Sequence, residues 1–290
     1  MKLIIGTPQF GMHYGPQNPP VVPTSAVKSI LNAAVEMKCK TLDTSPLYGN
    51  TERVLGQIKQ DGLEYISKLP LIDSNTKVSH YIRSTLQQTL DNLHVSRLSA
   101  YLSHDPEQFS KINSREVAEA LLELKMEGKT KKVGVSVYTP QQLFRVLDVF
   151  TPDVVQAPVN LLDHSFCTPE ITKIFIENNM ELHARSIFLQ GVLLIQQDKL
   201  PKYFACWRDT WDQLDDWIGS VFAGERVSGC VEIAKRLSHV TGMVVGVRSV
   251  DELKHVVKAS KRKPKLTIDL PAIDSTDVRL INPSNWELNT

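Results

Sequence analysis

The stretch KVGVSVYTPQQLFRVLDVF, residues 132–150, contains the local pattern that decides the fold. Residues 132–137 form a short run rich in valine, which is typical of a buried β-strand. Thr139 and Pro140 then mark the first turn of a helix, where proline is favoured because its missing N–H would have no partner there. In 140–150 apolar residues recur every three or four positions, which predicts a helix with one buried face. The stretch therefore predicts a strand followed by a helix.

The same alternation recurs along the chain without a break in composition. Further segments with helical periodicity lie at 26–37, 81–93 and 115–128. Eight strands, each followed by a helix, imply a parallel sheet that closes on itself. We therefore predict an α/β fold, a single (β/α)8 TIM barrel formed by one domain over residues 1–290; a doubly wound open sheet is the alternative. The expected strands lie near residues 2–5, 40–43, 64–68, 98–103, 132–137, 153–157, 181–187 and 242–247.

Composition and charge argue against several classes of partner. The chain has 33 lysine and arginine residues against 32 aspartate and glutamate residues, so bulk charge favours neither nucleic acid nor an acidic membrane. It lacks an apolar run of the roughly 18–20 residues that a membrane helix needs, and its N-terminus does not resemble a signal peptide. The cysteines are scattered without the spacing of metal ligands, as in a reducing compartment. We expect a cytoplasmic protein that binds a small molecule and no metal; its oligomeric state is left open.

One stretch, residues 188–241, is longer than the other connections between strands. It contains YFACWRDTW, in which Tyr203, Trp207 and Trp211 fall four residues apart. This spacing would place the three rings on one face of a helix. Aromatic stripes of this kind usually pack on a core, but the same segment, 203–217, could instead form a flap over a ligand. The sequence leaves both interpretations open.

Polar residues stand at the carboxyl ends of three successive expected strands. Asp43 ends the second strand, Lys68 the third and His104 the fourth. Tyr48 lies in the loop after Asp43, in the stretch LDTSPLYGN (42–50). Since the chemistry of an eight-stranded barrel collects at this end, the four side chains should lie together. Burying four titratable groups costs stability unless they are paired. An ion pair of Asp43 with Lys68 and a structural hydrogen bond for His104 are the alternatives without chemistry.

These four residue types together suit a reaction at a carbonyl group. A free phenol has a pKa of about 10, and a neighbouring ammonium group lowers that pKa. A carboxylate keeps the ammonium charged, and a neutral imidazole can donate a hydrogen bond to a substrate oxygen. We expect Tyr48 to protonate the carbonyl oxygen, Lys68 to lower the pKa of Tyr48, and the Asp43–Lys68 pair at the rim to add little stability. None of the four is a strong reductant, so the nucleophile must come from elsewhere.

Several short stretches, spread over nearly the full length, match the motifs of a known family. They are GTPQFG, LDTSPLYGNTERVLG, SKLP, LSHDP, VGVSVYTP, VQAPVNLLD, ARSIFLQGVLL and VVGVRSVDEL. On these stretches the sequence resembles the aldo-keto reductase family. The resemblance implies a (β/α)8 barrel that transfers hydride between a nicotinamide cofactor and a carbonyl compound or an alcohol. It also places the catalytic residues of the family on Asp43, Tyr48, Lys68 and His104.

The resemblance also implies where the cofactor binds. No Gly-x-Gly-x-x-Gly follows a strand, and the family lays the nucleotide in an extended form across the barrel mouth. Ser136 and Gln156 would bind the carboxamide. Arg185 would face the nicotinamide ring, unless it pairs with Asp163. Amides of the next loop would meet the pyrophosphate, and the start of the last helix would bind phosphate at the adenosine end. The loop residues are Ser186, Phe188 and Gln190, and the helix residues are Gly246, Arg248 and Ser249.

Some positions depart from the family pattern. Val137 stands where asparagine is common, so one amide contact is in doubt. Glu252, His255 and Val256 stand where relatives contact the adenosine. Arg248 offers a cation to the 2′-phosphate of NADPH, whereas Glu252 would repel the same phosphate if it faced inward. We expect NADPH as the cofactor, preferred about tenfold over NADH, which would also be accepted.

Together these features predict an NADPH-dependent oxidoreductase that reduces an aldehyde or ketone to an alcohol, or runs the reverse reaction. RSIFLQGVLL and the terminal INPSNWEL resemble bacterial members associated with surface-polysaccharide biosynthesis, which implies a sugar-like carbonyl substrate. Two other functions are alternatives. One is a catalytically weak nicotinamide-binding sensor that acts through a partner protein. The other is a barrel aldolase that uses Lys68 to form a Schiff base.

Overall fold

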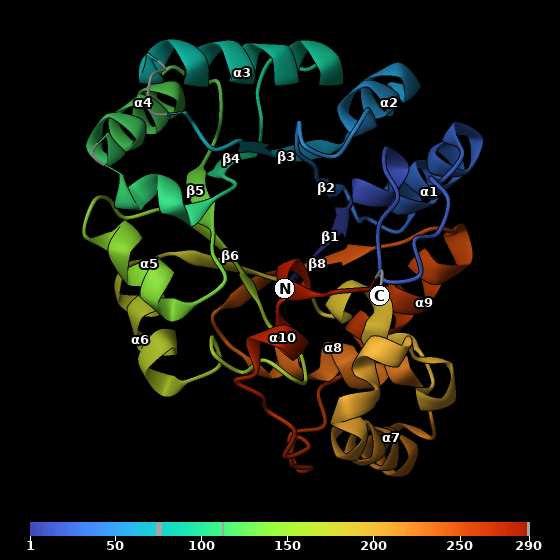
Figure 1. Ribbon diagram of the computed structural model, residues 1–290. Coiled ribbons are helices and arrows are strands. Elements are labelled where there is room, and N and C mark those ends of the chain that lie inside the picture. Colours follow the sequence, from blue (N-terminus) through green and yellow to red (C-terminus); the bar gives the residue numbers. More distant parts are fainter. Residues whose placement is uncertain (74–76, 112, 289–290) are drawn as a thin grey trace.

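The computed structural model describes residues 1–73, 77–111 and 113–288, and its eight β-strands close into a barrel (Figure 1). Neighbouring strands are parallel all the way around, and the last strand pairs with the first. The predicted (β/α)8 barrel is confirmed, and the open sheet is excluded. The strands are β1 (Lys2–Gly6), β2 (Thr41–Asp43), β3 (Glu64–Leu69), β4 (Ala100–Ser103), β5 (Val133–Ser136), β6 (Val154–Pro158), β7 (Glu181–Arg185) and β8 (Val240–Gly246).

Helices surround the barrel because each strand is followed by a helix before the next strand begins (Figure 1). Two of them, α7 and α8, follow β7, and a short α10 follows the last helix of the ring. The predicted start of α5 is confirmed, since Thr139 and Gln142 form a capping box there. The helices are α1 (Thr24–Glu36), α2 (Thr51–Ile58), α3 (Val78–Leu93), α4 (Ser114–Met126), α5 (Pro140–Leu147), α6 (Pro169–Glu177), α7 (Arg208–Phe222), α8 (Arg226–Arg236), α9 (Val250–Lys261) and α10 (Val278–Ile281).

A small apolar cluster fills the barrel below the carboxyl ends of the strands. Residues two apart along a strand share a face of the sheet. Ile66 therefore lies on the same face as Lys68. Val154 likewise lies on the same face as Gln156. The cluster forms an apolar floor beneath the polar side chains at this end of the barrel. Its buried members are Ile4, Ile66, Ala100, Leu102 and Val154.

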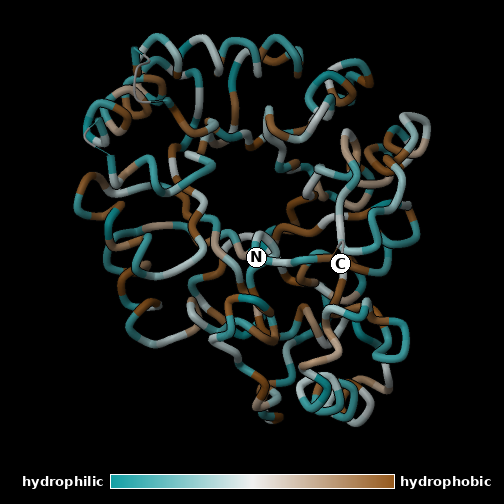
Figure 2. The backbone as a smooth tube through the Cα atoms, viewed as in Figure 1, coloured by the Kyte–Doolittle hydropathy of each residue, from teal (hydrophilic) through white to brown (hydrophobic). Residues whose placement is uncertain are grey.

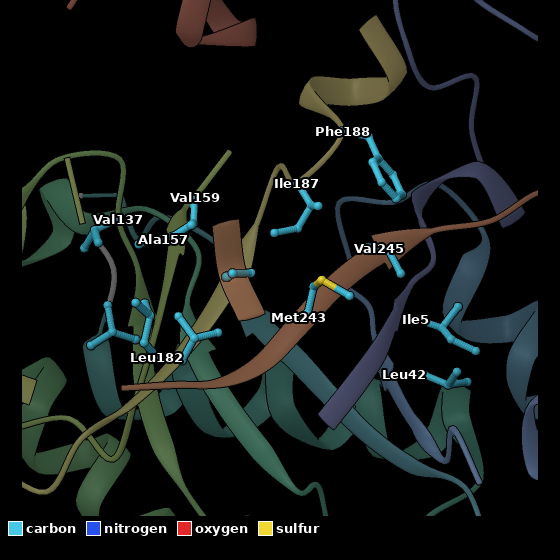
Figure 3. Packing of buried hydrophobic residues seen from close by; sticks show 14 of the residues in the cluster. Ile5, Leu42, Val137, Ala157, Val159, Leu182, Ile187, Phe188, Met243 and Val245 are labelled. Carbon is cyan, nitrogen blue, oxygen red and sulfur yellow. The ribbon is translucent and has the colours of Figure 1, made fainter. Parts of the chain in front are cut away.

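The larger hydrophobic core lies between the strands and the surrounding helices. Figure 2 shows mostly apolar strands inside helices that alternate between apolar and polar residues, as expected of helices with one buried face. Figure 3 shows part of this core, with buried side chains from β2, β7 and β8 and with Ile187 and Phe188 on the chain just beyond β7. The buried hydrophobic core therefore extends into the loop that follows β7.

The aromatic segment 203–217 is not one continuous helix. Tyr203 and Trp207 lie in the 3₁₀ helix η5 (Lys202–Trp207), and Trp211 lies in α7. All three rings pack around Phe204, which is fully buried. Tyr203 and Trp207 also donate hydrogen bonds to α10 and to the residue that caps it. The segment fixes the C-terminal residues to the barrel, which supports the packing interpretation over the flap.

The extent of the domain was predicted as residues 1–290. The barrel and its helices run from β1 to α9, and the residues after α9 pack on η5 and on the loop after β6. The single domain stays a prediction. Among the described residues, no helix is long and apolar enough to cross a membrane.

Candidate active site

Closure of the barrel brings the predicted titratable residues to one end. Asp43 ends β2, Lys68 lies in β3, and His104 directly follows β4. Lys68 Nζ donates to Asp43 Oδ2 at 2.6 Å and to the Tyr48 hydroxyl at 3.3 Å. It also donates to the carbonyl oxygen of Thr44 at 3.0 Å. These contacts use all three hydrogens of an ammonium group. The Asp43 carboxylate, the Lys68 ammonium group and the Tyr48 phenol are therefore joined by hydrogen bonds.

The Asp43–Lys68 ion pair is buried. The side chains of Lys68 and Asp43 are only 2% and 5% exposed. Gln156 Nε2 donates to the other carboxylate oxygen, Asp43 Oδ1, at 2.6 Å. The sequence predicted a rim ion pair that adds little stability; closure of the barrel covers both charges, and the small contribution to stability stays a prediction. Removing one partner would leave a buried charge, which typically costs about 3–5 kcal/mol of stability.

A tight turn holds Tyr48 beside Lys68. Gly49 has a φ of 59°, in the left-handed region that favours glycine. A Cβ atom at Gly49 would also collide with the carbonyl oxygen of Gly11 in the loop after β1. The Thr51 hydroxyl donates to the Tyr48 carbonyl oxygen at 2.7 Å at the start of α2. The turn therefore packs closely on the neighbouring loop, and this contact orients the phenol.

Burial decides the protonation state of Tyr48. It raises the pKa of the phenol above the ordinary value of about 10, and the Asp43 carboxylate raises the pKa further. The expectation that Tyr48 has a lowered pKa is therefore wrong in this structure, since burial and the Asp43 carboxylate raise the pKa by more than the Arg185 guanidinium lowers it. Burial also lowers the pKa of Lys68, while Asp43 opposes that change. Tyr48 is thus protonated at neutral pH, the state in which a phenol can act as an acid.

The His104 imidazole is neutral, as predicted. Burial lowers the pKa of His104 to about 3, and the charges of Lys68 and Arg185 lower it in the same direction. The imidazole meets the Tyr48 ring edge-on, with 5.9 Å between the ring centroids. A neutral imidazole carries one N–H, so the position of that hydrogen decides what His104 can bind.

Ser45 lies beside a nitrogen of this ring, and the sequence did not predict it as a site residue. Ser45 Oγ lies 3.1 Å from His104 Nδ1 and accepts a hydrogen bond from the Leu47 amide at 3.2 Å. Within the described residues, His104 Nδ1 is the acceptor toward which the hydroxyl hydrogen can point. This favours the tautomer that carries its proton on Nε2. The available signal was a hydroxyl side chain two residues beyond Asp43, in the same loop.

A cavity of about 410 Å³ opens at this end of the barrel. Ser249 is the one predicted site residue that does not line it; its hydroxyl caps α9 and accepts from the Glu252 amide at 3.1 Å. Gln9, Tyr14 and Tyr138 line the cavity without having been predicted. The predicted residues in the lining are Asp43, Tyr48, Lys68, His104, Ser136, Gln156, Arg185, Ser186, Phe188, Gln190, Gly246 and Arg248.

The ends of β5 and β6 offer groups suited to an amide. Ser136 and Gln156 stand opposite each other in the sheet, and both are buried. Because Gln156 Nε2 is bonded to Asp43, its Oε1 is left as an acceptor. A hydroxyl and an amide oxygen fit the carboxamide of a nicotinamide. The side chain of Val137 is fully buried and adds no polar contact.

Arg185 stacks on an aromatic ring beside the cavity. Its guanidinium carbon lies 4.2 Å from the ring centroid of Tyr138. Arg185 Nη2 donates to the Val137 carbonyl oxygen at 3.0 Å. The Asp163 carboxylate accepts from the amide and hydroxyl of Ser165, and the ion pairs found among the described residues do not join it to Arg185. Arg185 Nε is buried without a partner in the described part of the chain, so it can donate to a ligand.

The loop after β7 contains several residues with a left-handed backbone. Ser186, Leu189, Gln190 and Gly191 have positive φ angles of 58°, 46°, 52° and 96°. The amides of Leu189 and Gly191 donate to carbonyl oxygens within the loop. Non-glycine residues in this region cost free energy and tend to occur at ligand sites. This loop is therefore a candidate ligand-binding segment.

Gln9 joins the end of β1 to the residue that follows β8. Gln9 Nε2 donates to the carbonyl oxygens of Gly6 and Val247, each at 2.9 Å. A Cβ atom at Gly246 would lie 3.1 Å from the same side-chain amide, tighter than ordinary contact. Glycine at position 246 therefore lets β8 pass close to Gln9. No group of three or more His, Cys, Asp or Glu side chains in the described ranges could hold a metal ion.

Comparison with known proteins agrees with this geometry. The model of the Aldo/keto reductase family matches residues 2–277. Prostaglandin F synthase 1 of Bos taurus is 26% identical over 161 residues, which cover 47% of this chain and 49% of that protein. Methylglyoxal reductase DkgB of Escherichia coli O157:H7 is 28% identical over 117 residues, 39% of this chain and 43% of that one. The chain thus matches about half the length of these curated relatives or less.

The solved structure of the aldo-keto reductase AKR11C1 from Bacillus halodurans, in its holo form, is similar to the whole barrel. Its TM-score is 0.72 at 19% sequence identity, and the match covers 91% of this chain and 87% of that one. At this identity the likeness shows the fold alone.

The protonation of His104 can be measured directly by NMR of the ¹⁵N-labelled histidine ring. We expect a neutral ring with its proton on Nε2 from about pH 5 upward, because the pKa of His104 is lowered by burial. Ser45→Ala should allow both tautomers, and Ser29→Ala on the exposed side of α1 should change nothing. A charged His104 at about pH 6, or a proton on Nδ1 in the wild type, would contradict the assignment.

The ionisation of Tyr48 can be followed by phenolate absorbance. Because the pKa of Tyr48 is raised, its phenol stays protonated as the pH increases and ionises only above about pH 10. Titration curves of the wild type and of Tyr48→Phe should therefore coincide between about pH 6 and 10. A phenolate signal near neutral pH that disappears in Tyr48→Phe would show that Lys68 dominates after all.

Proposed function

The chain belongs to the aldo/keto reductase family, and from that premise we propose that it is an oxidoreductase acting on a carbonyl group. In the proposed reaction, hydride passes between a nicotinamide cofactor and the carbonyl carbon of an aldehyde or ketone, and the reverse reaction oxidises an alcohol. The contact that supports this most strongly is Lys68 Nζ at 3.3 Å from the Tyr48 hydroxyl, with Asp43 behind the ammonium.

Tyr48 is the proposed general acid. During reduction its phenol gives its proton to the carbonyl oxygen as the carbonyl carbon gains hydride. The product is an alcohol, and Tyr48 is left as a phenolate. The charge of Lys68 stabilises that phenolate although burial opposes it, and Asp43 keeps Lys68 charged and in place. The phenolate regains a proton from solvent before the next turnover.

His104 is the proposed second donor to the carbonyl oxygen. In the proposed tautomer the neutral ring presents Nε2–H, and Nδ1 accepts from the Ser45 hydroxyl 3.1 Å away. A hydrogen bond from Nε2 orients the carbonyl and stabilises negative charge that develops on its oxygen. Charged imidazolium would compete with Tyr48 as the acid, so the low pKa of His104 leaves the proton transfer to the phenol.

A bound nicotinamide dinucleotide would supply or accept the hydride. Ser136 and Gln156 would hold its carboxamide, and Arg185 would lie against its ring and donate from Nε. The loop of Ser186, Phe188 and Gln190 would bind the pyrophosphate through backbone amides. NADPH, expected from the sequence, and NADH share all of these groups. The adenosine end of the cavity must therefore decide between the two.

The substrate is proposed to be a small carbonyl compound. A cavity of about 410 Å³ must hold part of the cofactor as well, which limits the size of the substrate. The hydroxyls of Tyr14 and Tyr138 in its lining suit a substrate with its own hydroxyl groups. This agrees with the sugar-like carbonyl that the sequence suggested, which stays a prediction. Methylglyoxal, which one relative reduces according to its name, is a useful simple test compound.

The geometry favours this function over an aldolase. A Schiff base needs the lone pair of an uncharged amine, whereas Lys68 donates to three acceptors and is only 2% exposed. A catalytically weak sensor would keep the same cofactor groups. It differs from an enzyme in turnover alone, so turnover separates the two.

Tyr48→Phe tests the proposed acid. Turnover of the best substrate from a panel of aldehydes, ketones and aldoses should fall at least about 100-fold, the scale of general acid catalysis. The dissociation constant of the cofactor should change by less than about twofold, since the phenol is not proposed to bind it. Tyr81→Phe, on α3 and outside the cavity, is the matched control. Near-normal turnover in Tyr48→Phe would remove Tyr48 from the mechanism, and no turnover in the wild type would favour the sensor.

A further inference from the structure

Two opposite charges line the cavity where α9 begins. Both Arg248 and Glu252 belong to its lining. Glu252 Oε2 accepts a hydrogen bond from the Arg248 amide at 2.7 Å, and the Glu252 amide donates to Ser249 Oγ at 3.1 Å. The arrangement resembles a capping box, in which the first turn of a helix is closed by its own side chains. The direction of Glu252 was left open by the sequence; the residue is exposed, and its carboxylate turns back to the start of α9 at the edge of the cavity.

The carboxylate of Glu252 occupies the place that an anion would take. A helix N-terminus attracts phosphate because its first N–H groups lack partners and carry partial positive charge. Here a carboxylate already bonds an amide at that end. A second anion close to it meets like-charge repulsion in a partly enclosed site.

The guanidinium of Arg248 is partly committed elsewhere. Arg248 Nη2 donates to the carbonyl oxygen of Pro20, in the segment that leads into α1, whereas Arg248 Nη1 is buried without a partner in the described part of the chain. Along α9, Lys254 Nζ lies 3.6 Å from Asp251 Oδ1, and His255 Nε2 lies 2.8 Å from Glu225 Oε1. A phosphate at this end would therefore meet this one guanidinium nitrogen of Arg248 and, beside it, the opposing carboxylate of Glu252.

We propose that Glu252 makes NADH the preferred cofactor of this chain, in place of the NADPH expected from the sequence. The inference rests on the proposed function, because it assumes that the adenosine end of a nicotinamide nucleotide lies at α9. A carboxylate accepts hydrogen bonds from the ribose hydroxyls of NADH, as acidic residues do in other dinucleotide sites. The 2′-phosphate of NADPH replaces one of those hydroxyls with an acceptor-only anion, which the carboxylate repels.

Binding constants of the full chain test the proposal without any turnover. Dissociation constants for NADH and NADPH would be measured by titration calorimetry on the wild type, Glu252→Gln and Asp251→Asn. Glutamine keeps an oxygen for the Arg248 amide, so the fold of α9 is retained. Asp251 is the matched control, because it lies one residue away and its side chain is 93% exposed.

The wild type should bind NADH at least about tenfold more tightly than NADPH. Glu252→Gln should tighten NADPH binding at least about tenfold and change NADH binding less than about threefold, while Asp251→Asn should change the ratio less than about twofold. A wild type that prefers NADPH, or a ratio unchanged in Glu252→Gln, overturns the role of Glu252.

The same titrations with ADP-ribose and 2′-phospho-ADP-ribose separate this proposal from the proposed function. These probes lack the nicotinamide but keep the adenosine end. The wild type should bind ADP-ribose more tightly than 2′-phospho-ADP-ribose, and Glu252→Gln should lose this difference. If it does, the role of Glu252 stands even if the protein shows no turnover. If neither these probes nor the dinucleotides bind, the cofactor site and the role of Glu252 both fail.

Discussion

The buried ion pair of Lys68 with Asp43 is the interaction on which the rest of the site depends. Two charges taken out of water are stable only when their remaining hydrogen-bonding groups are also satisfied. Here the ammonium has three acceptors, and the carboxylate accepts from Gln156 at its second oxygen. Neighbouring parallel strands of a closed barrel place all of these groups at one end, and the apolar floor beneath excludes water. The same pair then holds the phenol of Tyr48 at the cavity.

Much of this arrangement could be predicted from the sequence because it follows from periodicity and topology. Strand–helix alternation fixes the order of the strands, and parallel strands bring their carboxyl ends together. The positions of Asp43, Lys68 and His104 at strand ends were therefore enough to predict that they meet. The family resemblance implied that Ser136 and Gln156 act together, and the structure places them opposite each other in neighbouring strands. Their chemical roles stay proposals.

What the sequence could not supply depends on burial and on side-chain direction. The pKa of Tyr48 is raised because the closed barrel covers the phenol, and no local pattern reports how deeply a loop residue is covered. The contact of Ser45 with His104 joins residues 59 apart in the chain. The Glu252 side chain turns back to the start of its own helix, where its carboxylate accepts from the Arg248 amide. The sequence alone does not distinguish this direction from one out to solvent. The break between η5 and α7 was hidden because aromatic spacing alone does not show where a helix starts.

A double-mutant cycle on turnover tests the central claim that Lys68 acts through Tyr48. The cycle needs the turnover number of the wild type, Lys68→Met, Tyr48→Phe and the variant with both changes. If the ammonium serves the phenol, its removal matters only while the phenol is present. The double variant should then be within about threefold of Tyr48→Phe alone, since residues that act as one unit are not additive. The contrary result is a double variant that is slower than Tyr48→Phe by the full factor by which Lys68→Met is slower than the wild type. This would show that Lys68 acts independently of the phenol and would contradict the account.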